Sequence, residues 1–201
     1  MVGVDFVNVP SYPLHRDVPV STSRGDVLVD VVYGGAIYAH LDASTVGLAV
    51  TPEDYSELIA IGREVKHLLN KTAYARHPTD DRLSGIYGTI LFDDLGTTEA
   101  GDLHQRNVTV FADGEVDRSP CGSGTASRVA LLAATNVLRP GQELIHDSIV
   151  GTTFRARSLQ EVTVAGRPAV IPEVSGMAYR TGRHTFELDP ADPLGEGFVL
   201  R

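Results

Sequence analysis

The sequence is poor in cysteine and in basic residues. Cys121 is the single cysteine among 201 residues, which excludes an internal disulfide framework and the usual cysteine-based zinc sites. The thiol is therefore either a small buried apolar group or a reactive one. Lysine and arginine number 17 against 26 aspartate and glutamate, giving a formal net charge of -9. Because no basic cluster is present to bind a polyanion, we expect no nucleic-acid partner.

Long apolar runs are also missing. The most apolar stretch, residues 129–138, is far too short to span a bilayer. The first residues do not show a basic region followed by an apolar segment, as a secretion signal would. We therefore expect no membrane partner and a cytoplasmic location. With 42% apolar residues, the chain has enough material to bury one or two modest cores.

The first part of the sequence shows the alternating pattern of β-strands. In residues 26–33 the valines at 27, 29 and 31 alternate with Leu28, Asp30 and Val32. Strands are predicted at residues 2–9, 26–33 and 36–41, separated by turns at Pro13, Gly25 and the Gly34-Gly35 pair. Further strands are predicted at residues 85–92 and 106–112, and short ones from residue 145 onward.

Two helices are expected. Thr51 is predicted to cap the first, with Pro52 in the first helical position, and its apolar residues at 58, 61, 65 and 68 recur on one face. That helix should cover one side of a sheet. The second, residues 126–138, is apolar nearly all round and must be buried. The pattern predicts an α+β protein with one surface helix and one central helix.

The chemistry concentrates just before the central helix, in residues 117–128. Glycines and small residues at a helix start let backbone N–H groups converge on an anion such as a carboxylate. The positive end of the helix dipole at this place also favours a thiolate. Cys121 is therefore predicted to have a lowered pKa and to exchange protons with carbon. Asp117 would accept from a substrate ammonium or imino N–H. An amino acid would then be held at both ends, with the thiol facing its α-carbon.

Residues 117–126, DRSPCGSGTA, closely resemble the second catalytic motif of the proline racemase family, which includes hydroxyproline epimerases and trans-3-hydroxyproline dehydratases. Further matches follow in family order along the whole chain: FVNVPSY at 6–12, VVYGG at 31–35, HP at 77–78, NV at 107–108 with Phe111, and the closing DP, DP and GF pairs. The resemblance implies a fold related to diaminopimelate epimerase, in which a curved mixed β-sheet wraps around a buried central helix.

The resemblance also implies a site. Cys121 would be one of two opposed acid/base residues, the backbone N–H groups of Gly122 and Ser123 would bind the substrate carboxylate, and Asp117 would bind its nitrogen. No cofactor and no metal are expected, because the family stabilises the α-carbanion electrostatically in a closed pocket. The partner is a small imino acid, proline or a hydroxyproline.

The chain departs from the family pattern in lacking a second cysteine. Complete members carry an amino-terminal region with the first catalytic position, so only one of two domains is expected to be complete. Residues 1–168 would form the second, cysteine-bearing domain, and residues 169–201 would return to complete the first. A truncated gene product, a split gene or a cropped piece of a longer chain would explain this. A homodimer or a complementing amino-terminal half is the expected protein partner.

Three functions stay open. The strand around Gly88 resembles that of trans-3-hydroxyproline dehydratases, whereas 4-hydroxyproline epimerases commonly have a ligand-contacting histidine there, which favours dehydration. Cysteine at position 121 is also the racemase and epimerase pattern, and some dehydratases have threonine there. The third possibility is a non-catalytic remnant that only binds an imino acid or a partner chain. His77, His104, His146 and the Asp93-Asp94 pair are expected to be structural or solvated rather than catalytic.

Overall fold

The computed structural model describes residues 2–198. Within them, ten strands form one sheet in the order β1-β10-β9-β8-β6-β5-β4-β3-β2, with β7 paired to β6. The strands are β1 (Val2–Val7), β2 (Tyr12–Thr22), β3 (Gly25–Tyr33), β4 (Ile37–Asp42), β5 (Ile86–Thr97), β6 (Leu103–Phe111), β7 (Glu115–Val116), β8 (Leu144–Ser148), β9 (Thr153–Val164) and β10 (Arg167–Ala178).

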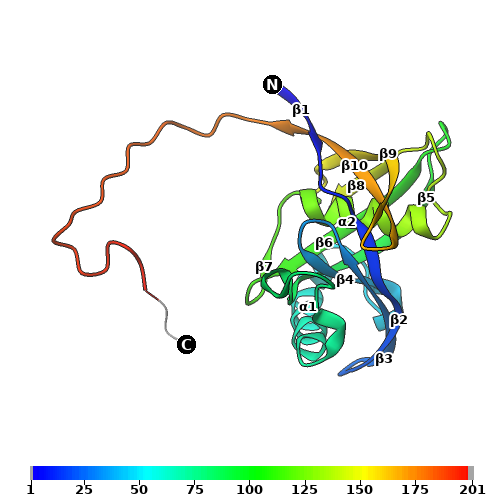
Figure 1. Ribbon diagram of the computed structural model, residues 1–201, viewed down its shortest axis with the longest axis horizontal. Coiled ribbons are helices and arrows are strands. Elements are labelled where there is room, and N and C mark those ends of the chain that lie inside the picture. Colours follow the sequence, from blue (N-terminus) through cyan, green and yellow to red (C-terminus); the bar gives the residue numbers. More distant parts are fainter. Residues whose placement is uncertain (1, 199–201) are drawn as a thin grey trace.

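The sheet is mixed and strongly curved. β4 pairs with β5 and β6 with β8 in parallel, and the other pairs are antiparallel. Its two ends meet, because Ser11 and Val170 exchange two backbone hydrogen bonds of 2.8 and 2.9 Å. Figure 1 shows the resulting wrap of strands around helix α2.

Helix α2 (Gly122–Ala134) fills the inside of the curve. Val129 and Ala130 pack with side chains from strands on both sides of the helix, such as Val32, Leu144 and Val174. Burying this apolar helix removes its surface from water, which is the main free-energy gain of the arrangement. The predicted α+β class, with a curved mixed sheet around a buried central helix, is confirmed.

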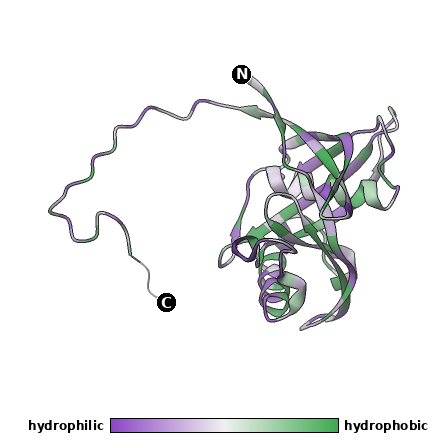
Figure 2. Ribbon diagram, in the orientation of Figure 1, coloured by the Kyte–Doolittle hydropathy of each residue, from purple (hydrophilic) through white to green (hydrophobic). Residues whose placement is uncertain are grey.

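Helix α1 (Tyr55–Asn70) covers the opposite face of the sheet. Leu58, Ile61 and Val65 are buried against the strands, and Figure 2 shows hydrophilic and hydrophobic residues side by side along the helix. The predicted surface helix is thus confirmed, but its start is not. Residues Pro52–Asp54 form a 3₁₀ turn, and the Thr51 side chain makes no capping hydrogen bond.

The bounds predicted for the central helix were also wrong. It begins at Gly122 and ends at Ala134, not at 126 and 138. Asn136 adopts the left-handed conformation, with a φ of 58°. The N–H groups of Asn136 and Val137 bond back to Ala133 and Leu132, which closes the helix four residues before the apolar pattern ends.

Strand β2 was missed by the sequence analysis, which placed a turn at Pro13. In the structure Pro13 pairs with Val32 inside β2, and the register shifts directly after it. Proline lacks the N–H of a regular ladder, but β2 is the last strand in the sheet order, where proline is tolerated.

Strand β10 crosses the boundary predicted between residues 168 and 169. Ala169 and Val170 are buried in the core, and β10 pairs with both β9 and β1. Residues 179–198 then leave the sheet and run away from the body of the molecule (Figure 1), with their side chains exposed. The assignment of this carboxy-terminal segment to another domain stays a prediction.

Candidate active site

Cys121 stands at the amino terminus of helix α2, as the residue before its first turn. Its carbonyl accepts the first helical hydrogen bond, from Thr125 N–H at 2.7 Å. The backbone is strained there, since φ is 66° and ψ is 119°, a combination that a side chain with a Cβ rarely adopts. The side chain is only 7% exposed.

The sulfur atom lies among hydrogen-bond donors. The Tyr38 hydroxyl is 3.6 Å from Cys121 Sγ and 2.7 Å from Ser123 Oγ. The Gly124 N–H and the Ser123 hydroxyl also interact with the sulfur. Tyr38 comes from β4 and is 1% exposed, so its ring is held by the packing around it. These groups provide a polar setting for a thiolate in a buried place.

The predicted lowering of the Cys121 pKa was wrong. Burial raises the pKa of this thiol above its ordinary value, and the nearby Asp117 carboxylate raises it further. Hydrogen bonds from Tyr38, Gly124 and Ser123 act in the opposite direction without overcoming burial. The ligand-free site therefore holds a protonated thiol at neutral pH.

The first turn of α2 presents two free backbone donors. Among the described residues, the N–H groups of Gly122 and Ser123 have no hydrogen-bond acceptor. The β3–β4 turn packs directly on this helix end. A Cβ on Gly34 would lie 2.5 Å from Ser123 O and 2.8 Å from Ser127 N, so glycine is required for the approach. The geometry is that of an anion-binding helix terminus with a buried sulfur beside it.

Asp117 lies on the approach to the same helix end. Its Oδ1 accepts hydrogen bonds of 2.9 Å from both the N–H and the hydroxyl of Ser119. The Ser119 hydroxyl is also 3.1 Å from Cys121 N, so the loop is tied together. The second carboxylate oxygen, Oδ2, makes no hydrogen bond among the described residues. It remains available to accept from a ligand.

All four predicted site residues line one pocket of about 410 Å³. The sequence analysis missed its aromatic wall. Tyr87 stacks on Phe111 with an interplanar angle of 4° and meets Tyr38 edge to face. No local pattern marks these residues as functional, because Tyr38 and Cys121 are 83 positions apart and only the folded sheet brings them together.

A buried polar layer supports the Cys121 loop from below. Thr125 and Asn107 both donate to the carbonyl of Pro120, at 3.1 and 2.9 Å. His146 Nδ1 is 2.9 Å from the Thr125 hydroxyl, and burial lowers the pKa of His146 to about 3. On the other side, His40 bonds to Ser127 at 2.9 Å. Both histidines are neutral supports of the helix start, not ligands in the pocket.

The other residues weighed in the sequence lie outside the pocket. His77 Nε2 is 3.2 Å from the Tyr12 hydroxyl, and its Nδ1 accepts from Asp80 N–H at 3.1 Å. His104 pairs with Asp147 at 2.7 Å. The two carboxylates at 93 and 94 belong to β5 and not to a loop, and they accept backbone N–H groups. These side chains serve the fold.

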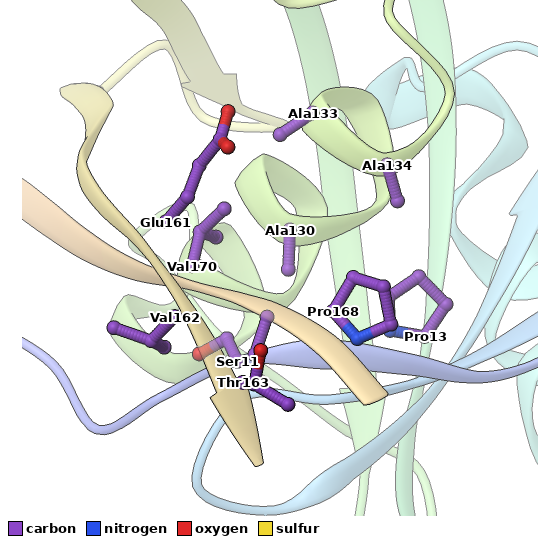
Figure 3. A pocket seen from close by; sticks show the side chains of 11 residues that line it. Ser11, Pro13, Ala130, Ala133, Ala134, Glu161, Val162, Thr163, Pro168 and Val170 are labelled. Atoms are coloured by element: carbon purple, nitrogen blue, oxygen red, sulfur yellow. The ribbon is translucent and has the colours of Figure 1, made fainter. Parts of the chain in front are cut away.

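A second cavity, of about 370 Å³, lies at the other end of α2. Figure 3 shows Ala130, Ala133 and Ala134 of the helix facing the β9–β10 hairpin across it, with Glu161 at its edge. Its polar lining consists of Glu161 and the hydroxyl residues Ser11 and Thr163, and it lies apart from Cys121. Within residues 2–198, no three histidine, cysteine, aspartate or glutamate side chains gather closely enough to hold a metal ion. No helix in that range is long and apolar enough to cross a membrane.

The fold is that of the proline racemases. The sequence model of the family described as "Proline racemase" matches residues 1–199, and the chain belongs to that family. Among curated relatives, it is 41% identical over 198 residues to a trans-3-hydroxy-L-proline dehydratase of Bacillus cereus. It is 46% identical over 202 residues to a 3-hydroxyproline 2-epimerase of Burkholderia multivorans.

Two solved structures have the same fold as this chain. A probable proline racemase of Agrobacterium radiobacter with bound carbonate has a TM-score of 0.86 at 33% identity. A hydroxyproline epimerase of Agrobacterium vitis with bound trans-4-hydroxy-L-proline has a TM-score of 0.85 at 35% identity. Each comparison covers 98% of this chain but only 56–58% of the relative. The chain therefore spans less than two thirds of the length of these proteins.

Proposed function

We propose that this chain supplies one face of an active site that removes the α-proton of a hydroxyproline, in a trans-3-hydroxy-L-proline dehydratase. Cys121 is the acid/base residue of that face and needs no cofactor. The observation that carries the proposal is the single pocket that joins the sulfur, two free backbone N–H groups and a carboxylate oxygen. The cytoplasmic location expected from the sequence belongs to the same proposal.

The substrate would be held at both ends. Its carboxylate accepts from the N–H groups of Gly122 and Ser123, where the helix dipole favours negative charge. Its nitrogen donates to Asp117. The pyrrolidine ring then lies against the aromatic wall of Tyr87 and Phe111, with the α-carbon toward Cys121 Sγ.

Dehydration needs one effective base. The Cys121 thiolate takes the α-proton, so the C–H bond breaks, an S–H bond forms and the electron pair moves into the ring. As the C3–O bond breaks, that electron pair forms the C2–C3 double bond, and the leaving hydroxide takes the proton from the Cys121 S–H, which gives water and restores the thiolate. Several relatives carry the dehydratase name. Position 88 supports this choice, because a Cβ on Gly88 would lie 2.9 Å from Val110 O, which leaves no room for the histidine expected of 4-hydroxyproline epimerases.

Racemisation or epimerisation is the second candidate, and the raised pKa of Cys121 favours it. Stereoinversion needs a protonated donor on one face of the α-carbon and a base on the other. A thiol that keeps its proton at neutral pH suits the donor. The opposing group would then come either from a complementing half that carries the part of the relatives' length that this chain does not span, or from a second copy of this chain.

Proton NMR in D₂O tests these functions together. With trans-3-hydroxy-L-proline, a dehydratase consumes substrate, whereas an epimerase yields the inverted isomer with deuterium at the α-carbon. A chain that supplies only one face of the active site exchanges the α-proton without inversion. Cys121→Ser should lower any of these rates by about 10²- to 10⁴-fold. An equal rate in that variant rejects Cys121 as the acid/base group.

A binding-only remnant gives a different result. Pyrrole-2-carboxylate, a planar mimic of the carbanion, should slow alkylation of Cys121 when it occupies the pocket. Protection of Cys121 without any α-proton exchange, even after mixing with an amino-terminal half of a relative, would support the binding-only function. Absence of both protection and exchange would reject the pocket itself.

A further inference from the structure

The hydroxyl of Tyr38 contacts the candidate acid/base sulfur, and no part of the proposed chemistry uses it. It is fully buried on β4, and its oxygen lies between Cys121 Sγ at 3.6 Å and Ser123 Oγ at 2.7 Å. A buried hydroxyl beside a titrating thiol can reverse its hydrogen bond as the thiol gains or loses a proton. Such a group stabilises both protonation states.

We propose that Tyr38 is a positioning residue that orients the Cys121 thiol and stabilises its thiolate through the phenol hydroxyl, with Ser123 as the second member of the chain. The inference rests on the proposed function, because it assigns Tyr38 a role in the proton transfer at that site. Tyr38 acts through the sulfur and touches no reacting carbon.

Counting protons defines two states of the hydrogen-bond chain that links Cys121, Tyr38 and Ser123. When Cys121 is a thiol, S–H donates to the Tyr38 oxygen and the Tyr38 O–H donates to Ser123. When Cys121 is a thiolate, Ser123 O–H turns to the Tyr38 oxygen and the Tyr38 O–H turns to the sulfur. Two hydroxyls change direction, neither loses its proton, and the hydrogen bond between Tyr38 and the sulfur is kept in both states. Taking the α-proton from substrate runs this change from the second state to the first.

The phenol itself stays protonated throughout. Burial raises the pKa of Tyr38 far above its ordinary value, and the nearby thiolate raises it further. The Tyr38 hydrogen bond is the largest of the effects that lower the Cys121 pKa. Tyr38 therefore donates to the sulfur but does not replace it as the base.

The packing holds this hydroxyl in place. Tyr38 and Ile90 form a small buried cluster with Cys121, and Tyr87 meets the Tyr38 ring edge to face with centroids 5.7 Å apart. A Cβ on Gly124 would lie 3.0 Å from the sulfur, so the helix also limits the positions of Sγ. With ring and thiol both confined, the 3.6 Å contact is a fixed feature of the site.

Tyr38→Phe tests the inference, because it removes one oxygen and keeps the ring. Cys121 is the sole cysteine, so iodoacetamide alkylation followed by mass spectrometry reports on it alone. The midpoint of the pH–rate profile should rise by about one unit, a tenfold loss of thiolate near neutral pH. The midpoint is the decisive readout, since a thiolate of higher pKa is also the better nucleophile, which partly offsets the rate.

Tyr87→Phe is the matched control. It makes the same chemical change on the neighbouring ring, whose hydroxyl has no hydrogen bond among the described residues, and it should leave the midpoint unchanged. If Tyr38→Phe does not fold, Ser123→Ala still tests the chain and should raise the midpoint by a smaller amount. An unchanged midpoint in Tyr38→Phe, or in Ser123→Ala where Tyr38→Phe does not fold, overturns the inference.

The proposed function can fail separately. A shifted midpoint in Tyr38→Phe, with no α-proton exchange by the wild-type chain or its mixture with an amino-terminal half, would retain the Tyr38–Cys121 coupling and reject the chemistry. Exchange in the wild type, with equal midpoints in Tyr38→Phe and wild type, would retain the chemistry and reject Tyr38.

Discussion

Replacing Cys121 by glycine should give a more stable protein than replacing it by alanine. Both variants lose the sulfur and its hydrogen bonds, but only alanine keeps a Cβ in a backbone with φ of 66° and ψ of 119°. Such a conformation costs a residue with a Cβ about 1–3 kcal/mol. Glycine loses about 0.4–1 kcal/mol through the greater entropy of its unfolded chain. The strain is the larger effect, so glycine should be favoured by about 1–2 kcal/mol.

Urea unfolding followed by circular dichroism measures this difference in the free energy of unfolding. In thermal unfolding, a protein of this size should show a melting temperature several degrees higher for the glycine variant. Ala126 provides the control, because it lies in the interior of α2. Ala126→Gly should destabilise by about 2 kcal/mol, because the ordinary helical penalty of about 1 kcal/mol is joined by the loss of one buried methyl group. If Cys121→Gly is no more stable than Cys121→Ala, the backbone at the sulfur is not strained and does not help to fix the thiol.

Three further predictions concern the surroundings of the thiol. Gly34→Ala should destabilise the fold by about 3 kcal/mol, because the added Cβ meets backbone atoms at 2.5 and 2.8 Å, whereas Gly3→Ala has open space and should be neutral in urea unfolding. Stability should fall as the pH drops from about 6.5 towards 3, because the unfolded chain binds protons at His146 and His40 that the buried rings do not accept. His146 accounts for on the order of 2 kcal/mol of this loss at pH 5, so His146→Gln should reduce the pH dependence of the urea midpoint, and the part due to His40 should remain. Between about pH 8.5 and pH 10 stability should fall again, because the unfolded thiol ionises first, and Cys121→Ala should remove that decline. A decline that persists within this range would contradict the raised pKa of Cys121, whereas the buried tyrosines add their own decline above about pH 10.

Local sequence patterns predicted the elements better than their ends. The apolar residues of α1 and α2 mark a one-sided and an all-round helix, and the buried faces follow them. The end of α2 could not be read from the apolar pattern, because Asn136 takes a left-handed conformation that apolar spacing does not reveal. Strand β2 was missed because Pro13 was interpreted by its local turn preference, while its place at the sheet edge is a tertiary feature.

The candidate site was predictable where it is contiguous. Asp117, Cys121, Gly122 and Ser123 lie within seven positions, and all four line the same pocket. Tyr38 was not predictable, because its partner is 83 residues away and only the pairing of β4 with β5 and the packing of α2 bring them together. The pKa of the thiol was predicted with the wrong sign, since a sequence shows the helix terminus but not the burial of the sulfur.

Burial and hydrogen bonding act against each other on this sulfur, and their balance fits acid/base work. A thiol that is only 7% exposed is costly to ionise, which keeps the proton on Cys121 until a ligand arrives. Asp117 adds to that cost while its carboxylate is free. A ligand nitrogen that donates to Asp117 would offset this part. The Gly124 N–H and the Tyr38 hydroxyl, which turns from Ser123 to the sulfur, would stabilise the thiolate as it forms. In the proposed function this change needs only the turning of two hydroxyls, so Cys121 would keep its proton before the substrate binds and would take the α-proton as a thiolate afterwards.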